Sequence, residues 1–176
     1  MKLRSCEELT TLQMEIILMK YFDFRRKIIV PNLTDMSLLV KFETDLLVLS
    51  KSNYATGVEI KVSKSDLKND LKKKQYGKYL RNQNEEVYKE LYYKPFKYFY
   101  YAVPKHLTND TLKTVHSFCG VLSVDVVNGK PRVKEERKPK LIFNKKWSQA
   151  KVMNLLRLGT MRIYKYKNKE LDCYER

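Results

Sequence analysis

Two apolar runs in the first third of the chain have the pattern of β-strands. Residues 43–50 and 57–62 are rich in Leu, Val and Ile, and polar residues flank the apolar positions. Short runs of this composition favour strands. We expect the two runs to pair as a hairpin whose loop centres on Ser52, which would place Asp45 directly opposite Glu59.

An amphipathic helix is expected before these runs, from Cys6 to about Phe24. Ser5, Glu7 and Glu8 are typical of a helix start. Apolar residues then recur at helical spacing. The expected buried stripe consists of Leu9, Leu12, Ile16 and Met19. Glu15 lies at the margin of this stripe, where a carboxylate is usually a salt-bridged boundary residue but can also reach a site above a sheet.

The rest of the chain alternates between strand and helix patterns. Ser63 and Asp66 have the form of a capping box, which predicts a helix directly after the second apolar run. Further strands are expected at 27–31, 98–104, 120–125 and 131–134, and further helices at 108–119 and 147–161. This order predicts an α/β sandwich with a mixed central β-sheet flanked by helices.

The two paired runs also carry the residues with the clearest chemical pattern. Residues two apart in a strand share a face, so Glu59 and Lys61 would project side by side. With Asp45 opposite, two carboxylates and one ammonium would converge. Such a pair of carboxylates favours a hard cation, Mg²⁺ or Mn²⁺, and a site of this kind cleaves phosphodiesters. The pattern alone leaves an alternative open, in which residues 58–62 form an edge strand with a solvated ion pair.

The charge of the chain indicates a polyanionic partner. The formal net charge is +16, and the excess of lysine and arginine is greatest at 61–78 and 130–146. Nucleic acid is the commonest polyanion in a cell. Lys64, Lys68 and Lys72 repeat at helical spacing and would form one basic face. An anionic membrane ranks low because neither stretch has the apolar face of an interfacial helix, and a merely solvated lysine-rich surface remains an alternative.

The remaining composition predicts one cytoplasmic domain, over 1–176. The 3 cysteines are widely spaced and include no CxxC pair, which is typical of a reducing compartment. The first residues lack the apolar core of a signal peptide. His106 and His116 have no acidic cluster around them and are expected to be ordinary surface or boundary residues.

At this level of detail the chain resembles the PD-(D/E)xK nuclease superfamily, and more narrowly the MmcB-like DNA repair proteins. The similarity runs through Asp45, the segment 59–66, Asp70, Lys72 and Tyr76, and it continues at 99–104 and 120–122. It covers about residues 10–125, within a core of about 7–125 that a C-terminal strand and helix at about 130–165 follow. The chain departs from the MmcB-like pattern at Leu67 and Lys73, and residues 78–97 look like an insertion.

The resemblance implies a role for each matching residue. Asp45 and Glu59 would hold the metal, Lys61 would act on the attacking water, and Glu15 would match a carboxylate of the first helix. It also implies a restriction-endonuclease-like fold. Lys64, Lys68, Lys72 and Tyr76 are the expected nucleic-acid contacts. Enzymes of this fold often pair to cut both strands, so a homodimer is left open.

The sequence therefore predicts a metal-dependent DNA nuclease, with an endonuclease favoured, in DNA repair or in the processing of phage and mobile-element DNA. RNA is not excluded as the substrate. One alternative is a nucleic-acid-binding or repair-accessory module that keeps the fold without turnover. Another is a small basic RNA-binding or structural protein in which the acid and lysine pattern is accidental. Metal-dependent cleavage separates the first hypothesis from the others.

Overall fold

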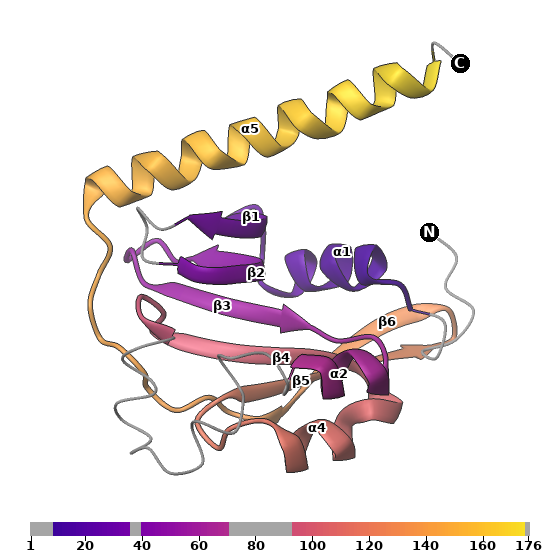
Figure 1. Cartoon of the computed structure of the whole chain (residues 1–176). Coiled ribbons are helices and arrows are strands. Elements are labelled where there is room, and N and C mark those ends of the chain that lie inside the picture. The colour runs from indigo at the N-terminus through magenta and orange to yellow at the C-terminus, as the bar shows by residue number, and fades with distance from the viewer. Residues whose placement is uncertain (1–8, 36–39, 71–92, 175–176) are drawn as a thin grey trace.

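A six-stranded mixed sheet forms the centre of the molecule, in a computed structural model that describes residues 9–35, 40–70 and 93–174 (Figure 1). The strands lie in chain order, from β1 to β6. They are β1 (Ile28–Asp35), β2 (Val40–Leu49), β3 (Ala55–Ile60), β4 (Tyr98–Pro104), β5 (Gly120–Val127) and β6 (Lys130–Arg137). The helices are α1 (Thr11–Tyr21), α2 (Lys64–Asp70), α4 (Thr108–Thr114) and α5 (Gln149–Tyr174). The predicted α/β sandwich with a mixed sheet is confirmed.

The position of β3 within the sheet tests whether its charges lie on an edge strand. β3 pairs antiparallel with β2 and parallel with β4, so it is the third of six strands and has a neighbour on each side. The edge-strand alternative is therefore wrong. The charges at the end of β3 are also buried, since Glu59 and Lys61 are only 5% and 4% exposed.

Each face of the sheet packs against its own apolar layer. On one face, α1 brings Met14 and Leu18 against residues of β2 and β3 such as Val58. The other face packs Leu67 of α2, the first turns of α5 and the rings of Tyr93 and Phe96 against β1 to β5. Gly57 leaves room for this second layer, because a Cβ atom at residue 57 would lie 2.6 Å from the Phe99 ring. These layers hold the ends of β2 and β3 in fixed positions.

Helix α1 begins later, and buries a different face, than the sequence predicts. Thr10 is its N-cap, in a capping box with Gln13, so the helix starts at Thr11 and not at Cys6. Its buried residues are Met14, Glu15, Ile17 and Leu18, whereas Leu12 and Ile16 of the predicted stripe are 62% and 37% exposed. The helix carries apolar residues on two sides, and the sheet takes the side with Leu18. The predicted start signal lies outside the described residues.

The C-terminal elements also differ in length from the prediction. The expected helix at 108–119 ends at Thr114, and the final helix continues to Tyr174 rather than ending near residue 161. Asn128 and Gly129 form the predicted turn between β5 and β6, both with positive φ. Among the described helices, none is long and apolar enough to cross a membrane.

Arg137, at the end of β6, holds the segment that follows α4. Its guanidinium donates to the carbonyl oxygens of His116 and Cys119, each at 2.8 Å, and to that of Leu112 at 3.3 Å. Two of these acceptors lie in the segment after α4, and the third lies in its last turn. One residue of the basic run at 130–146 therefore has a structural role.

We expect Arg137→Ala to lower the free energy of unfolding by about 2 kcal/mol, because several charge-assisted hydrogen bonds would be lost at once. Urea denaturation of the variant gives this value directly. Arg132→Ala, on the exposed part of the same strand, is the matched control and should change stability by less than about 0.5 kcal/mol. Equal effects of the two substitutions would contradict the structural role of Arg137.

Candidate functional site at the end of strand β3

The hairpin of β2 and β3 has the predicted register. Leu49 pairs with Ala55 and Leu46 with Val58, so the loop centres on Ser52. Continuing this register by one residue places Asp45 opposite Glu59. The Asp45 carboxylate accepts a hydrogen bond from the Ile60 amide through Oδ2, at 2.6 Å. Asp45 is thereby fixed against the last residues of β3.

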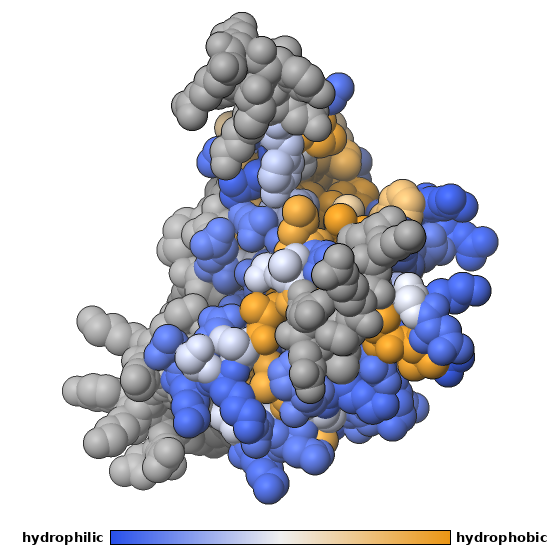
Figure 2. Space-filling view, turned by 90° about the vertical axis from the view of Figure 1, so that its right-hand side faces the viewer, coloured by the Kyte–Doolittle hydropathy of each residue, from blue (hydrophilic) through white to orange (hydrophobic). Residues whose placement is uncertain are grey.

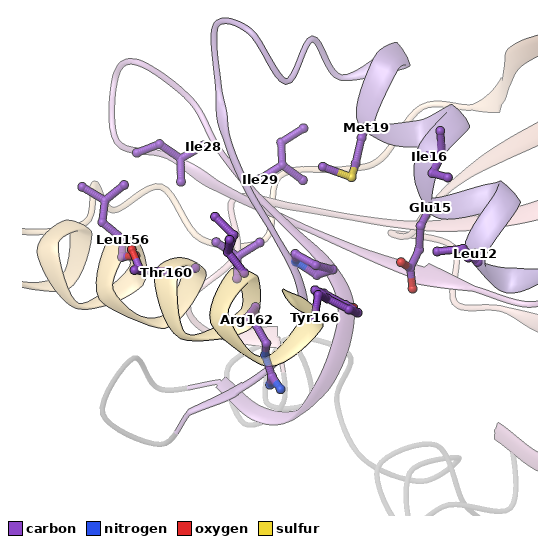
Figure 3. Close-up of a pocket in the computed structure, with 14 residues that line it drawn as sticks. Leu12, Glu15, Ile16, Met19, Ile28, Ile29, Leu156, Thr160, Arg162 and Tyr166 are labelled. Carbon is purple, nitrogen blue, oxygen red and sulfur yellow. The ribbon is translucent and has the colours of Figure 1, made fainter. Parts of the chain in front are cut away.

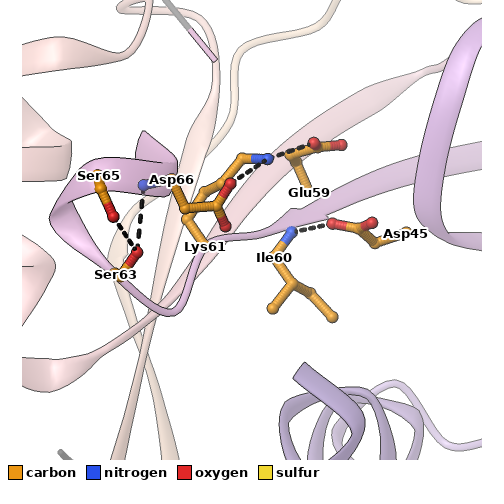
Figure 4. A network of polar contacts seen from close by, with 7 residues as sticks. All are labelled: Asp45, Glu59, Ile60, Lys61, Ser63, Ser65 and Asp66. Atoms are coloured by element: carbon orange, nitrogen blue, oxygen red, sulfur yellow. Dashed lines mark hydrogen bonds and ion pairs between the residues drawn. The ribbon is translucent and has the colours of Figure 1, made fainter. Parts of the chain in front are cut away.

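Glu59 and Lys61 form a buried ion pair at the same end of the strand. Lys61 Nζ lies 2.7 Å from Glu59 Oε1, and the two side chains are 5% and 6% exposed. The Lys61 amide donates to the Ala102 carbonyl of β4 at 3.0 Å, which extends the parallel pairing beyond Ile60. Figure 4 shows Asp45, Glu59 and Lys61 around this end of β3. The structure thus brings together the three residues that the sequence singles out.

Helix α2 adds a third carboxylate, that of Asp66, which the sequence indicates only as part of the helix cap. The Ser63 hydroxyl accepts from the Asp66 amide at 3.1 Å, as the predicted cap requires. The Asp66 carboxylate lies 3.8 Å from Lys61 Nζ and is half-exposed (Figure 4). Lys61 therefore lies between a buried and a half-exposed acid. The feature of the sequence that could have indicated this contact is the shorter Asp66 at a capping-box position where Glu is usual.

Glu15 approaches the site from α1 and is itself buried. Asn32 Nδ2 donates to its Oε1 at a distance of 3.5 Å. Burial raises the pKa of Glu15, the Asn32 hydrogen bond opposes that rise, and the negative charge of Asp45 adds to it. The charge of Asp45 therefore acts on Glu15, and the role of Glu15 in a site stays a prediction.

An apolar cavity of about 610 Å³ lies beside Glu15, between α1, β1 and α5. Figure 3 shows its lining, to which α1 contributes Leu12, Ile16 and Met19. These three residues belong to the stripe that the sequence predicts to be buried. In a view from the end of the molecule where α1 lies, Figure 2 shows an apolar patch within a largely hydrophilic surface.

Glu15→Gln should stabilise the protein at pH 8 but not at pH 4. The folded-state pKa of Glu15 lies above its ordinary value of 4.5, so ionisation in the buried position costs stability as the pH rises through the folded pKa. Below 4.5 the carboxyl is protonated in both states and the cost is absent. Thermal unfolding at both pH values measures this difference. The exposed Glu43→Gln is the control, and an equal change in Tm at pH 4 and pH 8 would contradict the prediction.

The predicted basic face of α2 is only partly described. Lys64 Nζ lies 2.9 Å from Asp110 of α4, and both side chains are exposed. This contact lowers the pKa of Asp110 through its hydrogen bond and its charge. Lys68 is exposed, whereas Lys72 and Tyr76 lie outside the described residues. One of the three predicted phosphate contacts therefore already binds a carboxylate.

The acids at the end of β3 suit a hard divalent cation. Asp45 binds an amide through Oδ2 and Glu59 binds Lys61 through Oε1, and each carboxylate carries a second oxygen. Mg²⁺ commonly uses one or two protein carboxylates and completes its shell with water and substrate phosphate. Within the described ranges, no group of three or more His, Cys, Asp or Glu side chains could hold a metal. The fit therefore rests on Asp45 and Glu59.

The comparisons with known proteins concern the fold and not the activity. No family model matches the chain, and no curated protein matches it. Among solved structures, the chain is similar to the SPO1766 protein of unknown function from Silicibacter pomeroyi. The TM-score is 0.59 at 14% sequence identity, and the alignment covers 96% of this chain and 97% of that one. The two proteins share a fold along almost their whole lengths.

Proposed function

We propose that this chain is a metal-dependent DNA nuclease of the PD-(D/E)xK type. In this proposal Asp45 and Glu59 hold Mg²⁺ or Mn²⁺, and Lys61 is the fixed cation of the site. The observation that carries the proposal is the meeting of these three residues at one end of a central strand, with Lys61 buried against Glu59.

The burial of the ion pair supports a chemical role. Removing two charges from water is expensive, and apolar residues of similar volume often stabilise a core equally well or better. The Glu59–Lys61 pair lies on a central strand whose other side chains are mostly apolar. A buried charged pair beside a second acid is what metal and phosphate chemistry needs, because the reacting charges are then met by fixed partners in a low dielectric.

The residues of the chain divide the work between them. A bound divalent cation supplies a water of lowered pKa and polarises the scissile phosphate. Asp45 and Glu59 place that cation, and the amide of Ile60 fixes the direction of the Asp45 carboxylate. Lys61 is held as an ammonium donor by Glu59, so we assign it an electrostatic role toward the phosphate instead of the role of general base. Glu15, on α1, lies within electrostatic reach of Asp45, whose charge adds to the rise in the pKa of Glu15.

The substrate class follows from the charge and from the chemistry of the site. A net charge of +16 attracts polyanions over long distances, and a phosphodiester is the bond that such a site hydrolyses. A titration of Mg²⁺ and Mn²⁺ over single-stranded, duplex, flapped and branched DNA, with RNA in parallel, tests the proposal. We expect cleavage of at least one DNA substrate with metal and none in EDTA.

A second candidate is a nucleic-acid-binding or repair-accessory module on the same fold. The observation that favours it is the bond of 2.7 Å between Lys61 and Glu59, because this bond balances the buried carboxylate without a metal. Such a module would bind DNA equally well in EDTA and in Mn²⁺ and would leave every substrate intact.

A further inference from the structure

A second charged region lies at the opposite end of β3, around Tyr54. Lys97 Nζ is 3.9 Å from the centroid of the Tyr54 ring, and Lys146 Nζ is 5.8 Å from it. Tyr54 directly precedes β3, whereas Glu59 and Lys61 lie at its other end. At about 3.3 Å per residue, the two regions are about 20 Å apart along the strand.

Two hollows open at this end of the sheet, and Tyr54 connects them. Tyr54 and Lys97 line a hollow of about 340 Å³. Lys146, whose Nζ lies over the same ring, lines a second hollow of about 230 Å³ together with Lys94, Lys145 and Lys151. We call Tyr54, Lys94, Lys97, Lys145, Lys146 and Lys151 the Tyr54 surface. Among the described residues, no Asp or Glu lines either hollow.

Some lysines elsewhere in the described chain pair with carboxylates, whereas four lysines of this surface do not. Lys105 and Lys134 reach the carboxylates of Asp125 and Glu136 at 2.5 and 2.8 Å, and Lys64 reaches Asp110 at 2.9 Å. Lys97, Lys145, Lys146 and Lys151 have no described carboxylate within 4 Å. Burial, and then the nearby charge of Lys145, lower the pKa of Lys151. These four like charges are therefore gathered without a counter-charge from the described residues.

Aromatic rings lie among these lysines. Lys94 Nζ is 4.9 Å from the centroid of the Phe143 ring, and both Phe143 and Tyr54 are half-buried. A lysine over a ring at such a position contributes little, about 0.5–1 kcal/mol. The lysines can therefore turn toward phosphates at small cost and leave ring faces for bases. Ser148 directly precedes α5 and lines the same hollow, and the start of that helix adds partial positive charge.

We propose that the Tyr54 surface binds single-stranded nucleic acid. Its lysines contact successive phosphates, and Tyr54 and Phe143 stack on bases that a single strand exposes. Lysine-rich grooves with interleaved rings bind single strands with little sequence preference, since every base has a stacking face. This surface is separate from the proposed nuclease site, and its binding requires neither a metal nor cleavage.

The test uses fluorescence anisotropy of a labelled single strand of about 20 nucleotides, in EDTA, with the full chain. The triple variant Lys145→Gln, Lys146→Gln, Lys151→Gln should raise the Kd by at least about tenfold. It should also reduce the slope of log K against log[salt] by about 2, at roughly 0.7 per lost contact. The control Lys113→Gln, Lys130→Gln, Lys138→Gln removes the same charge from exposed positions elsewhere. Equal losses in the two triple variants would overturn the proposal.

Two further comparisons identify the occupant. Tyr54→Leu should weaken single-strand binding by about tenfold or more, as the loss of a stacking platform does, and duplex binding far less. Equal losses for single strand and duplex would overturn the single-strand assignment. Vesicles with anionic lipid provide the other polyanion, and the proposal fails if the lysine variant loses vesicle binding while its oligonucleotide binding is unchanged. Thermal unfolding shows whether each variant is folded.

The outcome is separable from that of the nuclease proposal. Asp45→Asn should bind the single strand in EDTA as the wild type does, because Asp45 lies at the other end of β3. Cleavage that persists in the lysine variant would support two separate sites. Loss of binding specifically in that variant supports the Tyr54 surface even if the wild type cuts no substrate.

Discussion

Lys61→Met is expected to lower the free energy of unfolding by about 3–5 kcal/mol, because it leaves the Glu59 carboxylate buried without its ammonium partner. Glu59 also lies on a central strand, so it cannot turn to solvent without disrupting the pairing of β3. Urea denaturation at neutral pH measures the loss. In a chain of this length the expected decrease in Tm is about 6–20 °C.

The double variant Glu59→Met, Lys61→Met separates the charge from the packing. It replaces both charged groups by apolar side chains of similar length, so most of the lost stability should return. A loss below about 1 kcal/mol for Lys61→Met alone would contradict the buried ion pair, since a hydrated pair contributes no more than that.

The second large effect concerns cleavage and follows from Asp45. Asp45→Asn should reduce the single-turnover cleavage rate by a factor of roughly 10² or more, because it removes a charged metal ligand that acts on the transition state. The fold should persist, since the asparagine carbonyl can still accept from the Ile60 amide. The control is Asp110→Asn, which removes an exposed acid away from the site. An unchanged rate in Asp45→Asn would contradict its role as a ligand.

The local part of the candidate site could be predicted from the sequence. The period of two in a strand fixes which residues share a face with Glu59, and a short hairpin loop fixes which residue lies opposite it. The cap at Ser63 is equally local. These features need no knowledge of the rest of the fold, and the structure confirms each of them.

Longer-range pairing decided what the sequence left open. The parallel pairing of β3 with β4 makes β3 a central strand, and the two strands are separated by more than 35 residues of chain. No local pattern near Glu59 contains that information. The ion pair of Lys64 with Asp110 likewise joins segments far apart in sequence, as do the hydrogen bonds that Arg137 donates.

The wrong assignment of the buried face of α1 has a different cause. Residues 12–19 are apolar at both Leu12 and Leu18, which lie on different sides of the helix, so the periodicity supports two stripes. The sheet covers one of them, and α5 forms the apolar cavity beside the other. Because the sheet packs on the side with Leu18, Leu12 and Ile16 are not in the core.

The most direct test of the central claim is single-turnover cleavage by the wild type in Mn²⁺, with EDTA as the blank and Asp45→Asn purified in the same way. The account predicts cleavage of at least one DNA substrate that requires metal and is lost in Asp45→Asn, which also excludes a contaminating nuclease. Wild-type protein that leaves the whole panel intact in both Mg²⁺ and Mn²⁺, or that cleaves equally as Asp45→Asn, would contradict it.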